Sequence, residues 1–165
     1  MTQTLSRRTL FLTAGAVALT GCAPDAADAS TRQYANSPFR RVTDAQWRQR
    51  LPRAAYDVLR HEATERPGSS PLNNESRRGT FVCRGCDLPL FRSQWKYDSR
   101  TGWPSFYDVI AANIGTKTDY AIGIPRVEYH CARCLGHQGH VFDDGPRPTG
   151  KRYCNNGVAL KFVPA

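Results

Sequence analysis

The sequence predicts a mainly β fold with short helices packed at its N-terminal side. Helical patterns lie before the Pro67–Pro71 loop, whereas short strand-like runs separated by turns follow from Gly79 onward. The chain of 165 residues also holds 13 Gly and 11 Pro, which favours many turns over a helical bundle. Helices followed by strands indicate one β-dominated domain with its helices on one side.

Two helices are expected in the first part of this domain. Thr43 stands three positions before Gln46, which is the spacing of a capping box that starts a helix. Pro52 ends this helix and can serve as the first residue of a second one. Apolar residues recur between positions 56 and 59 of the second helix, which ends before the Pro67–Pro71 loop.

The strands are expected where apolar residues alternate or run together over short lengths. Turn residues separate these runs, as they do in antiparallel sheets. The expected strands cover residues 80–82, 88–91, 120–124, 127–130, 140–142 and 158–163.

Residues 1–21 are expected to be an export signal. Arg7 and Arg8 form a twin arginine, and the apolar run Leu10–Leu19 behind it is shorter than the roughly 20 residues that span a bilayer. Twin arginines direct folded proteins to export. Leu19–Cys22 also resembles a bacterial lipobox, which predicts a lipidated Cys22 on the periplasmic side of the membrane. The alternative is a soluble exported protein in which Cys22 has no role.

Residues 22–42 are expected to be a flexible tether, because small and polar residues follow Cys22 without an apolar period. The domain is then expected to cover residues 43–165. The chain has 23 basic and 14 acidic residues, a formal net charge of +9. These basic residues are scattered rather than gathered in a run, so we interpret them as a solvated surface and expect no nucleic-acid partner.

Two C-x-x-C pairs predict a metal centre. Cys83 and Cys86 form the first pair, and Cys131 and Cys134 form the second. Four thiolates match the tetrahedral coordination of structural Zn²⁺, and Gly85 could supply a backbone angle that other residues avoid. Export makes two disulfides an alternative, and redox-active C-x-x-C motifs are a third. A chain that folds in the reducing cytosol before export favours zinc.

Zinc knuckles also occur in nucleic-acid-binding ribbons, which gives a second class of function. Such a module predicts exposed aromatic residues or a basic stripe beside the knuckles. Here a histidine-rich turn and an isolated cysteine follow them instead, which favours an enzyme.

Cys154 is the candidate nucleophile because it lies outside both C-x-x-C pairs. Lys151 and Arg152 are close to it in sequence and could favour the reactive thiolate. His137 and His140 offer imidazoles for proton transfer near neutral pH. Structural roles are expected for the other two histidines, His61 and His130.

Several longer motifs resemble those of one enzyme family. They are Gly102–Phe106 (GWPSF), Gly136–Pro146 (GHQGHVFDDGP) and 152–156 (RYCNN), with Thr64–Pro67 (TERP) as a further segment. In this order, and with the two C-x-x-C pairs in place, they resemble zinc-containing methionine sulfoxide reductases of the B type. The resemblance covers roughly Val42 to Phe162 and implies a β-rich domain of two antiparallel sheets.

The resemblance implies a role for each matching residue. Cys154 attacks the sulfur of a methionine R-sulfoxide, while His137 and His140 bind and protonate its oxygen through water. Asn156 helps to hold this network. Trp103 forms a wall for the substrate methyl group, and Arg152 lies beside the nucleophile.

The chemistry of the reaction is consistent with these residue types. Reduction of a sulfoxide needs a soft nucleophile, an acid for the departing oxygen and an apolar wall. Thiolate, imidazole and indole supply them. We interpret Asp143–Gly145 as a turn rather than a carboxylate metal site.

One position departs from the pattern of many members. Thr101 stands where they place a second cysteine that resolves the sulfenic acid formed on the nucleophile. The resemblance therefore implies repair of oxidised proteins or peptides with an external reductant, either a small thiol or a thioredoxin-like protein.

Overall fold

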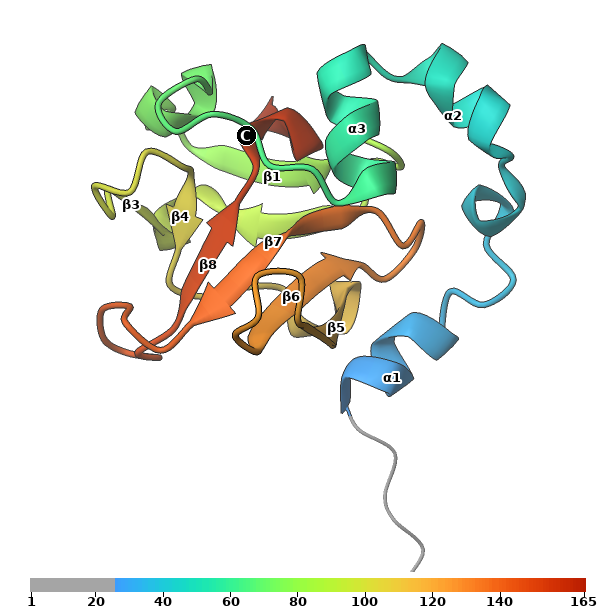
Figure 1. The fold of residues 1–165 in the computed structure, drawn as a ribbon. Coiled ribbons are helices and arrows are strands. Elements are labelled where there is room, and N and C mark those ends of the chain that lie inside the picture. The colour runs from blue at the N-terminus through green and yellow to red at the C-terminus, as the bar shows by residue number, and fades with distance from the viewer. Residues whose placement is uncertain (1–25) are drawn as a thin grey trace, which may run out of the picture.

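The computed structural model describes residues 26–165 as a mainly β fold of two antiparallel sheets. One sheet has the strand order β2-β1-β9, and the other has the order β3-β4-β8-β7-β6-β5 (Figure 1). Together with the few helices, this arrangement confirms the predicted fold class.

The strand bounds show where each sheet lies in the sequence. The small sheet holds β1 (Gly79–Cys83), β2 (Pro89–Arg92) and β9 (Leu160–Pro164). The large sheet holds β3 (Lys96–Tyr97), β4 (Ser105–Phe106), β5 (Ile114–Asp119), β6 (Arg126–Cys131), β7 (His137–Phe142) and β8 (Arg152–Asn155).

The helices are short and precede the sheets in the chain. They are α1 (Ala26–Arg32), α2 (Asp44–Arg50) and α3 (Arg53–His61), with 3₁₀ turns η1 (Pro38–Arg41), η2 (Pro71–Asn74), η3 (Ser93–Trp95), η4 (Ala111–Asn113) and η5 (Gly157–Ala159). Among the residues described, no helix has the length and apolar character needed to cross a membrane.

The expected capping box is present at the start of α2. The Thr43 hydroxyl accepts from the Gln46 backbone, and the Gln46 side chain accepts from the Thr43 backbone. Helix α3 begins directly after Pro52, and it packs its buried Tyr56 and Leu59 into the core. Both predicted helices are therefore confirmed.

The structure differs from the expected tether over residues 26–42. Helix α1 and turn η1 occupy this segment, and Tyr34 and Phe39 pack against the core. The Tyr34 hydroxyl donates to Asn113 Oδ1 at 2.9 Å, and Arg40 donates to the carbonyl of Ala132 at 2.8 Å. Aromatic and guanidinium groups thus fix a segment whose small residues predicted flexibility. The expected export signal and Cys22 lie outside the described residues.

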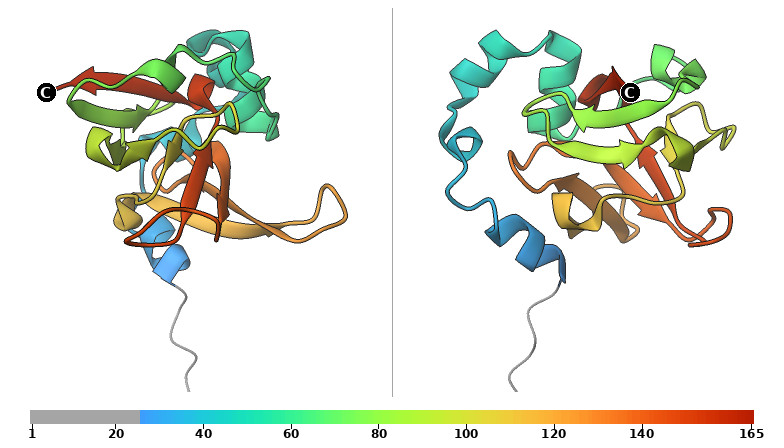
Figure 2. Two further views of the ribbon diagram at one scale, coloured as in Figure 1. Left: turned by 90° about the vertical axis from the view of Figure 1, so that its left-hand side faces the viewer. Right: turned by 180° about the vertical axis from the view of Figure 1, so that it is seen from behind.

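The core lies between the two sheets, which Figure 2 shows as separate layers. Phe91 of β2 stacks on Phe106 of β4, with ring centroids 4.0 Å apart, and meets Tyr129 of β6 edge-on at 6.2 Å. All three side chains are fully buried. Aromatic burial of this size provides much of the force that holds the sheets together.

Several strands differ from the sequence-based expectation. The apolar run 120–124 is not a strand but the turn between β5 and β6, with Tyr120, Ile122 and Ile124 exposed. Gly123 adopts a φ of 77° and Pro125 follows shortly after, so the run cannot stay extended. The polar strand β5 and the short strands β3, β4 and β8 were not expected.

Candidate active site

Cys154 lies near the middle of the large sheet. Strand β8 runs between β4 and β7, and Cys154 is paired with Ser105 on one side and with His140 on the other. Directly opposed residues on antiparallel strands point to the same face. The strand register therefore places a thiol beside an imidazole.

A cavity of about 130 Å³ opens at this point. It combines the half-buried thiol with an indole, an imidazole and a guanidinium. Its lining residues are Thr64, Trp103, Arg126, Gly139, His140, Phe142, Cys154, Asn155 and Asn156.

Gly139 permits the close approach of β7 to β8 beside this cavity. A Cβ at this position would overlap the carbonyl oxygen of Cys154. Only glycine therefore allows the strand pairing that places His140 opposite Cys154.

His140 is oriented by a carboxylate. Its Nε2 lies 2.7 Å from Asp119 Oδ2, which also accepts from Arg126 at 2.5 Å. Burial lowers the pKa of His140, and the hydrogen bond to Asp119 only partly offsets this effect. The backbone of Ala121 and the side chains of His140 and Arg126 hold the pKa of Asp119 well below its usual range. Asp119 thus remains a carboxylate.

Trp103 and Asn156 are held by hydrogen bonds on the far side of the cavity. The indole N–H of Trp103 donates to the carbonyl of Glu65 at 3.1 Å. Asn156 accepts from the Glu65 backbone at 3.0 Å and donates to the Gln138 carbonyl at 3.0 Å. These bonds fix both side chains before any ligand arrives.

The four remaining cysteines of the described residues form one buried cluster. Cys83 Sγ lies 3.6 Å from Cys134 Sγ, and Cys86 Sγ lies 3.4 Å from Cys131 Sγ. All four are free thiols, with their sulfur atoms within 4.8 Å of one another. Disulfide sulfurs would be about 2.05 Å apart.

This cluster fits a tetrahedral metal. Sulfur ligands at about 2.3 Å from Zn²⁺ are separated from one another by about 3.8 Å. The left-handed turns that shape the two knuckles lie at Asp87 and Leu135, with φ of 58° and 59°, rather than at Gly85 as expected. In each knuckle a backbone N–H past the second cysteine bonds back to the carbonyl of the first.

Comparison with known proteins identifies the family. A family model described as the SelR domain matches residues 51–164. The chain is 50% identical over 122 residues to the chloroplastic peptide methionine sulfoxide reductase B1 of Oryza sativa subsp. japonica, which covers 73% of this chain and 57% of that protein. The chain belongs to the peptide methionine sulfoxide reductase B family.

Two other relatives differ in how much of their length is matched. The chloroplastic peptide methionine sulfoxide reductase B1 of Arabidopsis thaliana is 45% identical over 134 residues, which are 81% of this chain and 66% of that protein. The peptide methionine sulfoxide reductase MsrB of Bradyrhizobium diazoefficiens is 48% identical over 123 residues, which are 74% of this chain and 88% of that protein. The chain therefore spans less than two thirds of the two chloroplastic relatives and most of the bacterial one.

Two residues with roles in the family pattern lie behind the cavity wall. His137 is 3% exposed and does not line the cavity, and its Nδ1 lies 2.8 Å from Glu128 Oε1. Arg152 donates two hydrogen bonds of 2.8 Å to Asp144, with its guanidinium over the ring of Phe142. His137 and Arg152 therefore lie behind the surface of the cavity.

The surroundings of Cys154 set the charge of its thiol. Burial raises the pKa of Cys154, while Arg152 and a hydrogen bond from Thr101 act to lower it, and burial dominates. Arg152 thus acts in the expected direction. Lys151 instead pairs with Asp143 and has no such effect. The free thiol is therefore more protonated near neutral pH than an ordinary cysteine.

Thr101 lies where a resolving cysteine stands in many family members. Its hydroxyl reaches Cys154 and also lies 2.8 Å from the Ser99 hydroxyl. The position thus faces the nucleophile, although its side chain cannot form a disulfide.

Asp119, Glu128 and Arg126 were not among the sequence-predicted site residues. No sequence feature singled them out, because acidic and basic residues are common near the ends of strands. Only the pairing of β5, β6 and β7 brings them to the two histidines.

Proposed function

We propose that this protein reduces the R-sulfoxide of peptide-bound methionine, with Cys154 as the nucleophile. The supporting observation is the single cavity that brings together the thiol of Cys154, the imidazole of His140 and the indole of Trp103. Family membership supports the reaction class, and the names of the relatives refer to peptide methionine sulfoxide.

In the first step, the sulfur of Cys154 attacks the sulfoxide sulfur. The S–S bond formed by this attack breaks again as the oxygen passes from the substrate to Cys154, so the substrate S–O bond is replaced by an S–O bond on the cysteine. Methionine is reduced by two electrons, and the thiol is oxidised by two electrons to a sulfenic acid. Proton transfer to the oxygen assists this step, and we assign it to the imidazoles of His140 and His137, acting through water.

The second step uses an external thiol. The four other cysteines of the described domain are clustered away from the cavity, and Thr101 is not a thiol. An external thiol attacks the sulfenic acid, releases water and forms a mixed disulfide. A second thiol then cleaves this disulfide and regenerates Cys154. Small thiols and thioredoxin-like proteins are the proposed reductants, and repair of oxidised proteins is the proposed role.

Zn²⁺ is the proposed occupant of the cysteine cluster, where it has a structural function. Cys83, Cys86, Cys131 and Cys134 supply four buried thiolates and leave no open coordination position. We assign this metal no part in the reaction, because none of its ligands lines the cavity.

Export to the periplasmic side, with a lipid on Cys22, is also part of the proposal. The twin arginine at Arg7–Arg8 and the lipobox-like Leu19–Cys22 support it. Cys22→Ala should release the protein from the membrane fraction. Unchanged processing and fractionation of this variant would favour a soluble exported protein.

A stereospecific assay tests the catalytic proposal. The R- and S-sulfoxides of a blocked methionine are offered with a small dithiol, to the full chain and to Cys154→Ser. The R-sulfoxide should be reduced by the wild type alone, since a hydroxyl is a far weaker nucleophile than a thiol. Absence of turnover in the wild type, or equal turnover in Cys154→Ser, contradicts the proposal and favours a zinc-ribbon binding module.

A further inference from the structure

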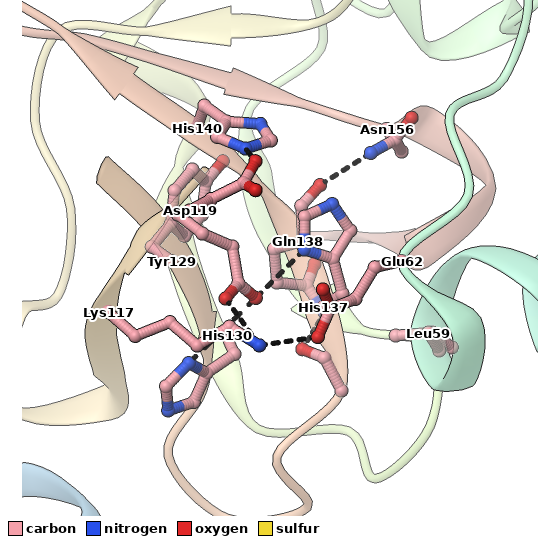
Figure 3. Close-up of polar contacts among 12 residues, drawn as sticks. Leu59, Glu62, Lys117, Asp119, Tyr129, His130, His137, Gln138, His140 and Asn156 are labelled. Carbon is pink, nitrogen blue, oxygen red and sulfur yellow. Dashed lines mark hydrogen bonds and ion pairs between the residues drawn. The ribbon is translucent and has the colours of Figure 1, made fainter. Parts of the chain in front are cut away.

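A buried carboxylate lies behind His137. Glu128 of β6 and His137 of β7 are both 3% exposed as side chains, and Oε1 of Glu128 lies 2.8 Å from Nδ1 of the imidazole (Figure 3). Neither residue lines the cavity. Charged groups are rarely buried this deeply unless they are paired, so we looked for a function of the Glu128–His137 pair.

The charge of Glu128 is maintained by its neighbours. Lys117 of β5 places its Nζ 3.1 Å from Glu128 Oε2 and forms a second ion pair with Glu62, while His130 Nδ1 lies 3.9 Å from Oε1. Burial acts to raise the pKa of Glu128, but the contacts with His137 and Lys117 outweigh it and lower the pKa below its ordinary value. Glu128 is therefore a carboxylate.

An ionised carboxylate accepts hydrogen bonds and cannot donate them. The contact with Glu128 therefore requires the proton on Nδ1 of His137. The other nitrogen, Nε2, is buried and has no hydrogen-bond partner among the described residues. It lies on the opposite side of the ring from Nδ1, and Figure 3 shows His137 among His140, Asn156 and Lys117.

The two histidines of the GHQGH motif are thus held by opposite nitrogens. His140 uses Nε2 to contact Asp119, whereas His137 uses Nδ1 to contact Glu128. Their rings are 5.6 Å apart in an edge-to-face arrangement. The Nε2 atom of His137 therefore remains available for an additional partner.

We propose that Glu128 is the positioning residue that fixes the tautomer and orientation of His137, so that Nε2 is the nitrogen that exchanges a proton, through water, with the sulfoxide oxygen in the cavity. The proposal rests on the proposed reductase function. A carboxylate on Nδ1 stabilises the imidazolium that donates from Nε2, and it holds the ring in place after the proton has left. Glu128 acts through His137 and does not touch the substrate.

The proposal is tested with the full chain carrying Glu128→Gln, which keeps the size of the side chain and removes its charge. Turnover of the R-sulfoxide should fall by about 10- to 100-fold with little change in KM, because proton transfer typically contributes at least this factor. Glu62→Gln is the matched control. It removes the exposed carboxylate that shares Lys117, and its turnover should remain within about twofold of the wild type.

Nitrogen NMR of the histidine rings measures which nitrogen of His137 carries the proton. This distribution would not change if Glu128 had only a structural role. In the wild type, Nδ1 of His137 should be protonated, and in Glu128→Gln the proton should shift toward Nε2. An unprotonated Nδ1 in the wild type overturns the proposal, and this measurement also decides the matter if the variant does not fold. Wild-type turnover in a folded Glu128→Gln variant also overturns it.

The experiments distinguish failure of the proposed reductase function from failure of the proposed role of Glu128. If the wild type reduces no sulfoxide, the reductase function fails, and the assignment of Nε2 to the sulfoxide oxygen fails with it. If the wild type is active but Glu128→Gln is equally active, only the role of Glu128 fails.

Discussion

Two cations follow each other in sequence beside the nucleophile, yet they face different partners. Arg152 acts on the thiol of Cys154 and pairs with Asp144, whereas Lys151 pairs with Asp143 at the surface. Proximity in sequence suggested that both would favour the thiolate. Lys151 precedes β8, whereas Arg152 and Cys154 lie two positions apart on β8 and therefore point to the same face.

This difference predicts the pH dependence of Cys154 alkylation. The pKa of this thiol is raised by burial and lowered by Arg152, so the alkylation rate should rise with pH through a midpoint above that of an ordinary cysteine. Arg152→Met should move the midpoint further up, because it removes the positive charge that lowers the pKa. Lys151→Met is the control and should leave it in place. A shift of the same size in both variants would show that general surface charge is responsible.

Thr101 predicts a gain of function at a single residue. Because its hydroxyl reaches Cys154, Thr101→Cys should place a second thiol near the sulfenic acid. One turnover without reductant should then give an intramolecular disulfide in the variant and a sulfenic acid in the wild type. Mass spectrometry distinguishes the two products. A disulfide in the wild type would indicate that a clustered cysteine takes part in catalysis.

At the scale of elements, local signals predicted the helices better than the strands. The capping box at Thr43 and the break at Pro52 act within a few residues, so the sequence was sufficient to place α2 and α3. The run 120–124 was apolar enough for a strand, but Gly123 and Pro125 turn it into a hairpin tip. Strand β5 is polar because it lies at the edge of its sheet, where apolar patterning is weak.

The pairing of β7 with β8 depends on the absence of a side chain at Gly139. Gly139→Ala would force a Cβ into the carbonyl oxygen of Cys154 and push the strands apart. We expect a loss of about 1–3 kcal/mol of stability, measured by denaturant unfolding, and a loss of reductase activity. Gly85→Ala is the control, because its Cβ would meet no atom closer than 3.4 Å. Equal stability of the two variants would contradict the argument.

At the scale of the molecule, the cysteine cluster connects the two sheets. Cys83 ends β1 of the small sheet, and Cys131 ends β6 of the large sheet. The spacing of the C-x-x-C pairs was enough to predict that the four thiols would meet. It could not show that they link separate layers, because the order of strands within a sheet depends on long-range pairing.

Removal of the proposed metal should therefore destabilise the whole domain. Structural Zn²⁺ contributes directly to folding, so chelation should lower Tm by at least about 10 °C, at roughly 4 °C per kcal/mol lost. Thermal unfolding with and without a chelator measures this, together with elemental analysis. Cys154→Ser should show the same shift, since Cys154 lies outside the cluster. An unchanged Tm in metal-free protein would refute a stabilising metal.

The catalytic residues were predicted as a set, but their arrangement was not. Cys154, His140, Trp103 and Asn156 do line one cavity. The carboxylates that orient the two histidines come from β5 and β6, and the sequence contains no local mark of that pairing. Motifs therefore identified four candidate side chains that meet at the cavity, but not that His137 and Arg152 lie behind it, which depends on the strand register.

The order of the strands along the chain has a consequence for synthesis on the ribosome. All four clustered cysteines and strands β5, β6 and β7 emerge before β8, which carries Cys154 and joins β4 to β7. A nascent chain can thus assemble its cysteine cluster while the two parts of the large sheet are still separate. Cys154 takes its place beside His140 only when that sheet closes, before β9 completes the small sheet, so the cavity forms late in synthesis.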